Sequence, residues 1–247
     1  HVGESLEEVD DYIWPRHVDA HNERLDLKVG DQAEYEEKIA TVINGDAPTA
    51  MAKACAELGI PFVHISTDYV FKGTGQAPWH PQDQTAPQNV YGRSKLAGET
   101  GIAESGGTYA ILRTSWVISA HGVNFIKTML CLSETRDALN IVGDQIGGPT
   151  PASDIALACL QIAKQLIQDP SKSGTYHFSG APNISWAGFA RKIFDQAGKS
   201  VAVTPIPTTD YPTPAQRPLN SRMDCTATKR AFGIERPDWV TGLKTIL

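Results

Sequence analysis

From about residue 46 onward, the chain alternates between short apolar runs and longer stretches whose apolar residues recur at helical spacing. A short apolar run such as residues 61–65 is typical of a strand buried in a parallel sheet. Strands separated by helices of ten or more residues indicate βαβ units. The pattern therefore predicts an α/β fold, a Rossmann-like doubly wound parallel sheet with a smaller C-terminal lobe. We expect strands at residues 61–65, 109–114 and 138–142, and helices at residues 49–58, 91–104, 124–134 and 153–165.

Polar and conformationally special residues mark the ends of these elements. Asp46 is a suitable N-cap before Pro48 in a first helical turn, and Gly59 suits the position just after that helix. Beyond Asp169 the pattern changes, because two short predicted helices are joined by a Pro-rich run that suits an irregular lobe. These segments are residues 185–197, 227–232 and 205–218.

Composition and charge narrow the class of protein. The chain has 22 Lys and Arg against 28 Asp and Glu, a formal charge of −6, which argues against non-specific binding to nucleic acid or anionic membranes. Its four cysteines form no CxxC pair, so neither a zinc site nor a disulfide framework is expected, which favours a reducing, cytoplasmic location. We see no apolar run of about 18 residues and no secretory leader, so no membrane-spanning segment is expected.

Tyr91 and Lys95 stand four residues apart in the stretch YGRSK, on a predicted helix. Residues four apart share one helix face, so the phenol and the ammonium can meet one ligand. A free tyrosine has a pKa of about 10, and a nearby ammonium lowers it toward the range useful for proton transfer to a carbonyl. The spacing alone is also typical of a surface Tyr and Lys on an amphipathic helix, so both interpretations stay open.

Ser66, Thr67 and Asp68 directly follow the strand predicted at residues 61–65. The carboxyl ends of strands in open α/β sheets are where ligands bind. The two hydroxyls suit a carbonyl oxygen, and the carboxylate can accept a hydrogen bond from a sugar hydroxyl. Such a cluster also forms helix caps and turns. Because no helical pattern follows at once, a ligand site is the favoured interpretation.

Several long motifs in this order resemble one family. They are STDYVFKGTGQAPWHPQDQTAPQNVYGRSKLAGE (66–99), RTSWV (113–117), NFIKTM (124–129), DQIGGPT (144–150), YPTPAQRPLNS (211–221) and PDW (237–239). From about Gln32 to Leu247 the chain resembles the dTDP-4-dehydrorhamnose reductases, which belong to the extended short-chain dehydrogenase/reductase superfamily.

The resemblance implies reduction of dTDP-4-dehydro-L-rhamnose to dTDP-L-rhamnose by NADPH or NADH. Tyr91 would give a proton to the C4 oxygen while the nicotinamide hydride reaches C4. Lys95 would hold the nicotinamide ribose and depress the pKa of Tyr91, with Ile65 also at the cofactor. Thr67 would hydrogen-bond the same C4 oxygen.

The resemblance also implies a set of substrate contacts. Asp68 would lie beside the sugar, and the Trp116 ring would pack against its apolar face, although simple core packing is the alternative for Trp116. Arg217 is a candidate for the pyrophosphate, because its forked guanidinium suits phosphate oxygens. Asn124 and Gln145 are either polar contacts to the substrate or structural hydrogen-bonding groups.

The family's organisation suggests a division of the chain. The NAD(P)-binding Rossmann-like domain is expected at residues 1–112 and 136–164, and the sugar-nucleotide substrate lobe at residues 113–135 and 165–247. His64 is interpreted as a buried, hydrogen-bonded histidine and not as a catalyst. The resemblance leaves open a homodimer and a magnesium ion, for which no carboxylate cluster in the sequence suggests a place.

The chain departs from the family at its start. The family begins with a Gly-rich GxxGxxG turn that lets the backbone approach the cofactor pyrophosphate, and this sequence contains no such motif. Either the sequence begins late in a longer gene product, as His1 in place of Met suggests, or the protein has lost the cofactor half of its fold. We favour the first explanation, because a sheet without its central first strand would expose edges and apolar surface. The choice between NADH and NADPH depends on that region and stays open.

Two other functions share these residues. A non-catalytic binding or regulatory subunit on the same fold would explain the lack of the Gly-rich turn. An epimerase or dehydratase of the same superfamily would use the same Tyr91 and Lys95 but would keep its cofactor tightly bound.

Overall fold

The computed structural model describes residues 29–247 of the chain. Its helices are α2 (Val29–Tyr35), α3 (Glu37–Thr41), α4 (Ala47–Glu57), α5 (Val90–Ala103), α6 (Phe125–Ser133), α7 (Ala152–Gln168), α8 (Trp186–Ala197), α9 (Thr226–Phe232) and α10 (Trp239–Ile246). Its strands are β1 (Phe62–Thr67), β2 (Tyr109–Thr114), β3 (Val117–Ile118), β4 (Ala138–Val142), β5 (Ile146–Gly147), β6 (Thr150–Pro151), β7 (Gly174–His177), β8 (Ile184–Ser185), β9 (Ala202–Ile206) and β10 (Asn220–Ser221).

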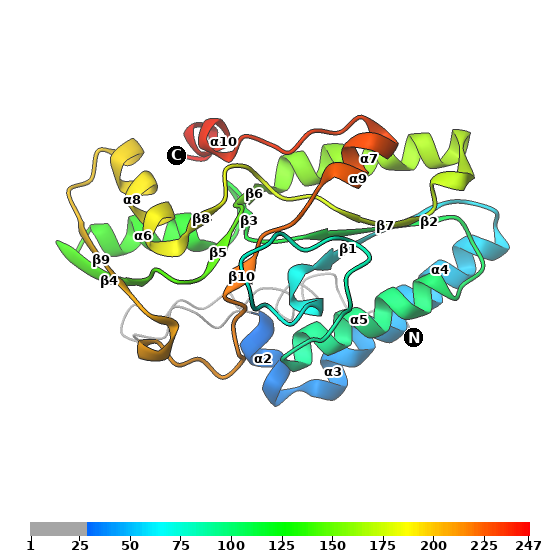
Figure 1. Ribbon diagram of the computed structural model, residues 1–247, viewed down its shortest axis with the longest axis horizontal. Helices are drawn as coiled ribbons and strands as arrows, with labels where there is room; N and C mark the ends of the chain where they lie inside the picture. The colour runs from blue at the N-terminus through cyan, green and yellow to red at the C-terminus, as the bar shows by residue number, and fades with distance from the viewer. Residues whose placement is uncertain (1–28) are drawn as a thin grey trace, which may run out of the picture.

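The longest strands of one half form a parallel sheet in the order β1-β2-β7. Helices α4 and α5 contact this sheet from one side and α7 from the other, as Figure 1 shows. Parallel strands buried between two helical layers are the arrangement expected of βαβ units, and the predicted Rossmann-like α/β class is confirmed. Strands β1 and β2 pair so that Thr67 lies beside Thr114, and the carboxyl ends of the two strands therefore lie side by side.

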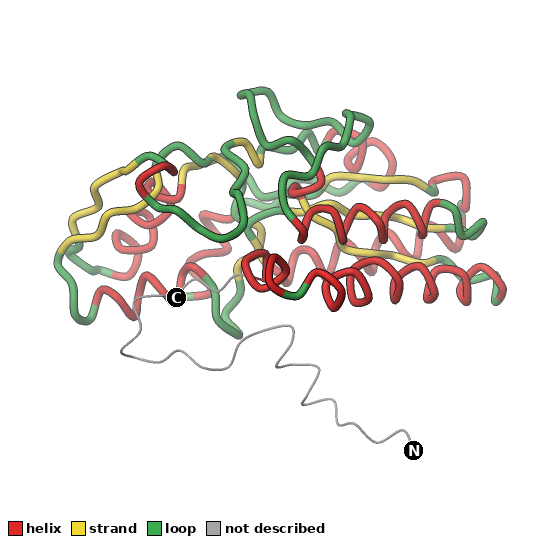
Figure 2. Tube along the Cα trace, turned by 90° about the horizontal axis from the view of Figure 1, so that it is seen from below, coloured by secondary structure: helices red, strands yellow, loops and turns green. Residues whose placement is uncertain are grey.

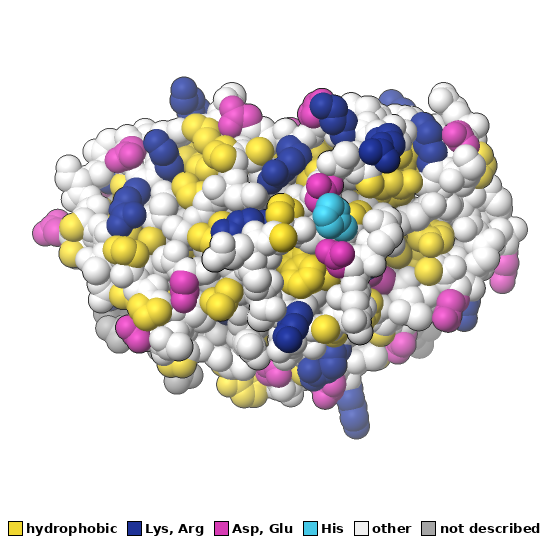
Figure 3. Space-filling model, in the orientation of Figure 1, with side chains coloured by type: hydrophobic (Ala, Val, Ile, Leu, Met, Phe, Trp, Pro, Cys, Tyr) yellow, Lys and Arg dark blue, Asp and Glu magenta, His cyan; other side chains and the backbone are white. Residues whose placement is uncertain are grey.

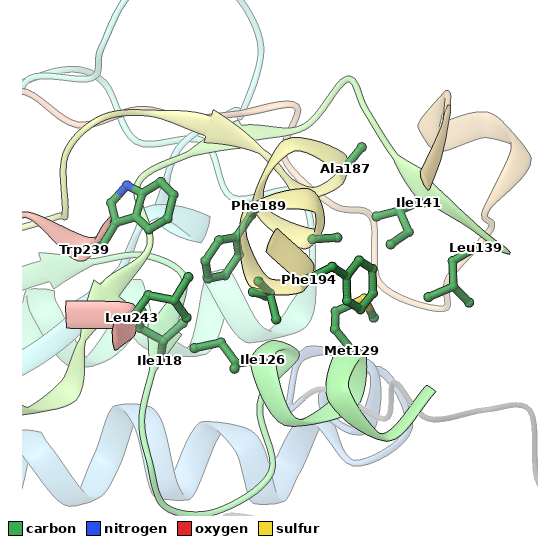
Figure 4. Packing of buried hydrophobic residues seen from close by; sticks show 12 residues of the cluster. Ile118, Ile126, Met129, Leu139, Ile141, Ala187, Phe189, Phe194, Trp239 and Leu243 are labelled. Carbon is green, nitrogen blue, oxygen red and sulfur yellow. The ribbon is translucent and has the colours of Figure 1, made fainter. Parts of the chain in front are cut away.

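The other half is built on a second core. Helices α6 and α8 pack together beside the parallel pair β4–β9, and α10 closes the cluster (Figure 4). The buried side chains of this cluster include Ile118, Ile126, Met129, Leu139, Ile141, Phe189, Phe194, Trp239 and Leu243. Figure 2 shows the strands and helices falling into two groups with loops between them.

Two strands pair differently from the expected division of the chain. Strand β4, which the sequence analysis placed with the nucleotide-binding domain, pairs with β9 of the second half. Strand β7, which it placed in the substrate lobe, pairs with β2 in the main sheet. Local hydrophobic pattern reveals that a segment is a strand, but its partner depends on which sheet edge is free in three dimensions.

The structure confirms that Gly59 follows the end of α4, but it contradicts the prediction that Asp46 caps the start of this helix. Gly59 has φ +66°, the left-handed conformation that ends a helix. Asp46 has helical backbone angles and its side chain caps nothing, because the chain enters α4 directly from a π-helical turn at Val42–Asp46. The N-cap prediction for Asp46 is therefore wrong.

Helix α5 lies unusually close to the π-helical turn Val42–Asp46 and to the first turn of α4. A Cβ added at Gly98 would stand 2.1 Å from the Asn44 carbonyl oxygen, and one at Gly101 would stand 1.9 Å from the Thr49 hydroxyl. Side chains cannot fit at such separations, so these two glycines allow the helices to approach. The close packing fixes the height of α5 against the sheet and thus the place of the residues on its sheet-facing side.

Candidate active site

The first turn of α5 brings Tyr91 to the carboxyl end of β1. The Tyr69 ring meets the Tyr91 ring edge-on at 5.5 Å between centroids. Burial raises the pKa of Tyr91 to about 12, while the neighbouring Thr67 hydroxyl acts in the opposite direction. Tyr91 therefore holds its proton at neutral pH and is ready to act as an acid.

Lys95 lies one turn further along α5, and its ammonium points at β1. Its Nζ donates to the Ile65 carbonyl oxygen at 2.7 Å and stands 3.2 Å from Nε2 of His64. Burial lowers the pKa of Lys95 to about 8, and Glu99 raises it in part. Sequence reasoning expected Lys95 to depress the pKa of Tyr91. In this geometry Thr67 is the neighbour that lowers it, because β1 acceptors hold the ammonium.

The sequence predicts that His64 is a buried, hydrogen-bonded histidine and not a catalyst, and the structure places its Nε2 beside the ammonium of Lys95. Burial, and then the charge of Lys95, lower the pKa of His64 to about 3. The imidazole is thus neutral, and its Nε2 can accept a hydrogen bond from the ammonium. The sequence signal was available, since His64 directly precedes the motif on the same strand.

Thr67 also serves as a cap. Its hydroxyl accepts a hydrogen bond from the backbone N–H of Tyr69 at 3.2 Å and starts the short 3-10 turn Asp68–Val70. The sequence analysis disfavoured a cap because no helical pattern follows, and that expectation is wrong. A single 3-10 turn is too short to show periodicity. The turn nonetheless presents Asp68 to the site.

Asp68 is a buried carboxylate, 3% exposed. Burial raises its pKa to about 6, and the hydroxyls of Ser221 and Thr67 partly counteract that effect. Three hydroxyl oxygens near the carboxyl ends of β1 and β2 are buried without a hydrogen-bond partner among the described residues, namely those of Ser66, Thr114 and Ser115. Buried polar groups without partners are rare, so this cluster fits a polar ligand rich in hydroxyls. Sequence reasoning missed Thr114 and Ser115 as candidates, although the RTSWV motif contains them.

Trp116 adopts an unusual backbone conformation with φ +50° just after β2. Its ring stacks on Trp186, with 3.6 Å between centroids and 10° between planes. A Cβ at Gly147 would stand 2.7 Å from the Trp116 ring, so only glycine fits there. A strained residue held by its neighbours is typical of a functional site.

Gln145 belongs to the same aromatic corner. Its side-chain oxygen accepts from the Trp186 indole N–H at 3.1 Å, and its amide nitrogen donates to the Thr208 hydroxyl at 3.2 Å. These contacts agree with the structural alternative for Gln145.

Asn124 has a similar structural use. It caps α6 by accepting from Ile126 N at 3.1 Å, and its amide donates to the Ser119 carbonyl oxygen at 2.8 Å.

Arg217 comes from the C-terminal loop and forms a buried ion pair with Asp31 of α2. Asp31 also accepts from the backbone N–H of Ala215 at 2.9 Å. Nη1 of Arg217 is buried without a partner in the described part of the chain. The guanidinium is therefore fixed on one side by Asp31 and keeps one donor for a ligand.

Among residues 29–247, His, Cys, Asp and Glu side chains form no group of three that could hold a metal ion. A helix long and apolar enough to cross a membrane is likewise absent from that range. The face drawn in Figure 3 mixes acidic and basic side chains over its whole area.

Comparison with known proteins agrees with this geometry. A family model described as the RmlD substrate binding domain matches residues 28–247. A dTDP-4-dehydrorhamnose reductase of Sinorhizobium fredii is 46% identical over 215 residues, which cover 85% of this chain and 73% of that protein.

Solved structures agree as well. The dTDP-4-dehydrorhamnose reductase of Clostridium acetobutylicum superposes with a TM-score of 0.80 at 35% identity, covering 89% of this chain and 76% of that one. The reductase of Bacillus anthracis, solved in complex with NADP, gives a TM-score of 0.79 at 38% identity, covering 87% and 75%. The family model matches most of the chain, and the relatives share a high level of identity with it. The chain therefore belongs to the dTDP-4-dehydrorhamnose reductase family.

Proposed function

We propose that this chain reduces the 4-keto group of dTDP-4-dehydro-L-rhamnose, giving dTDP-L-rhamnose, with NADPH or NADH as reductant. The observation that carries the proposal is the placement of the protonated Tyr91 beside Thr67 at the carboxyl end of β1, with Lys95 one turn away and held by the Ile65 carbonyl oxygen. This is the place in an open α/β sheet where ligands bind. The family resemblance assigns the reaction to the same three residues.

The residues around Lys95 fit the nicotinamide end of a dinucleotide. Two of the three ammonium N–H groups have acceptors on β1, and the third has none among the described residues, so it is available to a ribose hydroxyl. Ile65 contributes its carbonyl oxygen to this arrangement. The bound cofactor supplies a hydride to C4 of the sugar.

The protein's own part in the reaction is to place and protonate the carbonyl. Thr67 donates to the C4 oxygen and holds it beside the Tyr91 phenol. Tyr91 transfers its proton to that oxygen as C4 gains a hydride, so the ketone becomes a hydroxyl and the tyrosine a phenolate. The Thr67 hydroxyl, the neighbour that lowers the pKa of Tyr91, then stabilises the phenolate until a proton returns from solvent.

The remaining polar groups suit the sugar nucleotide. Asp68 and the unpartnered hydroxyls of Ser66, Thr114 and Ser115 can bind sugar hydroxyls. Trp116, held by Trp186, lines the sugar site with an aromatic ring. The free Nη1 of Arg217 suits a pyrophosphate oxygen.

The strand pairing supports a revised division of the chain. We place the main sheet with β7 in the cofactor part, and the β4–β9 pair with α6 and α8 in the sugar-nucleotide part. A cytoplasmic location and a homodimer are further parts of the proposal. The four free cysteines favour a reducing compartment, and light scattering of purified protein measures the oligomeric state.

Replacing Tyr91 with Phe tests the mechanism. We expect turnover of dTDP-4-dehydro-L-rhamnose to fall by at least about 100-fold, because the general acid is removed. The affinity of this variant for the sugar nucleotide should stay within a few-fold of the parent's, because phenylalanine keeps the aromatic ring and its packing. Tyr109→Phe, at the start of β2 and at the opposite end of the sheet, is the matched control and should keep full activity.

Near-normal turnover by the Tyr91→Phe protein would overturn the mechanism. Titration with NADPH and NADH, followed by tryptophan quenching, separates the reductase from a non-catalytic binding subunit. Binding of the dTDP-sugar without any binding of a nicotinamide cofactor would favour the subunit.

A further inference from the structure

The ammonium of Lys95 is held by two acceptors from adjacent residues of β1. The Ile65 carbonyl oxygen takes one N–H at 2.7 Å, and Nε2 of His64 lies 3.2 Å from the same nitrogen. The lysine stem has several rotatable bonds, and a freely rotating ammonium would have to be ordered each time a ligand binds. Two fixed acceptors remove that freedom beforehand.

His64 is suited to this contact by its surroundings. The imidazole lies on β1 beside Phe62, with 6.1 Å between ring centroids. Burial and the adjacent ammonium keep the ring neutral, so Nε2 stays an acceptor across the pH range of an enzyme assay. Nδ1 then carries the hydrogen.

We propose that His64 is a positioning residue for the reduction, accepting a hydrogen bond from Lys95 so that the remaining N–H of the ammonium points to the nicotinamide ribose. The proposal rests on the function proposed above and adds a residue to it. His64 acts through Lys95 and does not itself touch the reacting carbonyl.

Other ionisable groups lie near Lys95, and Glu99 also affects its pKa. On α5, Glu99 lies one turn beyond Lys95 and Tyr91 one turn before it. Glu99 forms a buried ion pair with Arg113 of β2, with 2.6 Å between Oε2 and Nη2. An acceptor at His64 favours the charged form of Lys95, and its loss should therefore lower the pKa of Lys95 further below about 8.

Two substitutions separate the acceptor from the shape of the side chain. His64→Phe keeps a planar ring and removes the acceptor, whereas His64→Gln keeps an acceptor at a similar distance from the backbone. His177→Phe is the control, because His177 is a buried histidine with an equally low pKa that bonds Trp79 and not Lys95.

The first readout uses the protein without cofactor. The pH dependence of Lys95 reductive methylation, followed by peptide mass spectrometry, gives the pKa of Lys95. We expect a fall of at least about half a unit in His64→Phe and no change in His64→Gln or His177→Phe. An unchanged pKa of Lys95 in His64→Phe would overturn the proposal, whatever the activity.

The second readout is kinetic. We expect the KM for NADPH to rise about tenfold in His64→Phe while kcat changes less than about threefold, and His64→Gln to stay within threefold of the parent in both. Equal impairment of both variants would show that ring shape and not the acceptor matters, and would overturn the proposal. If the parent protein bound no cofactor, the proposed function would fail, while the Lys95 titration would still decide whether the contact exists.

Discussion

At the scale of single residues, the site concentrates groups that the fold does not favour. Asp68 is a carboxylate buried at the end of β1, and Trp116 has a left-handed backbone. Both features cost folding free energy, and proteins tolerate such costs mainly where function requires them. Stability measurements should therefore detect these residues independently of activity.

Asp68→Asn should make the protein more stable at pH 8 than the parent. The pKa of Asp68 is raised from 3.8 to about 6, so the folded state holds the proton more tightly than the unfolded state between these values. In the parent protein, protonated Asp68 contributes fully to the free energy of unfolding below about pH 4, and this contribution is lost as the pH rises through 6. The shift of about two units corresponds to at most about 3 kcal/mol.

The measurement is urea unfolding of parent and variant at pH 5 and pH 8. We expect the stability difference to favour the variant more at the higher pH, together with weaker binding of the dTDP-sugar. A difference independent of pH would mean that Asp68 is not buried as a charged group.

At the scale of elements, α5 matters because it delivers both Tyr91 and Lys95. Its first turn is fixed from outside the helix: the Asn89 side chain accepts from Gly92 N at 2.8 Å, and Glu34 accepts from Val90 N at 2.6 Å. Asn89 also donates to the Gln216 carbonyl oxygen at 2.9 Å. The start of α5 is thus tied to α2 and to the C-terminal loop.

Asn89→Ala should reduce both stability and turnover. Loss of an N-cap costs about 1 kcal/mol, and here the bond to Gln216 is lost as well. Asp238→Ala removes a comparable cap from α10, where Asp238 accepts from Val240 N at 3.0 Å, and serves as the control. We expect similar losses of stability by thermal unfolding, but a loss of kcat only for Asn89→Ala. Equal kcat values for the two variants would contradict a role of this cap in placing Tyr91.

At the scale of the whole molecule, the buried pair of Asp31 and Arg217 joins the first described helix to the C-terminal loop. These residues are 186 positions apart in the sequence. Removing one partner of a buried pair leaves an uncompensated charge, whereas exposed pairs contribute little. The position of the pair in the fold, and not the charge itself, decides its effect.

Asp31→Asn should therefore cost about 3 kcal/mol of unfolding free energy. Glu134→Gln breaks the exposed pair of Glu134 and Lys199, whose atoms are 2.6 Å apart, and should cost less than about 1 kcal/mol. Urea unfolding at low and high salt compares the two. Equal losses would mean that the Asp31–Arg217 pair is open to water.

Much of the fold was predictable from sequence because it depends on short-range pattern. The strands at residues 109–114 and 138–142 are confirmed with those bounds, and the predicted catalytic helix differs from α5 by one residue at each end. The spacing of apolar residues and the turn residues at each end belong to the segment itself. They can therefore be recognised without knowing which other segment it packs against.

The family was also determined by sequence alone. The order of several long motifs identified it, and the comparisons confirm it. The single motif YxxxK would not have been sufficient, because spacing without context is also typical of an ordinary surface helix. The roles proposed for Tyr91, Lys95 and Thr67 come from that family resemblance, and the structure brings the three residues together at the carboxyl end of β1 without Lys95 lowering the pKa of Tyr91.

Tertiary structure alone decided which groups meet. The pairing of β4 with β9, the contact of His64 with Lys95 and the ion pair of Asp31 with Arg217 all join residues distant in sequence. The pKa values of Asp68 and Lys95 depend on burial and neighbours in the same way. Local pattern fixes period and turn, whereas partners and desolvation arise only when distant segments come together in the folded chain.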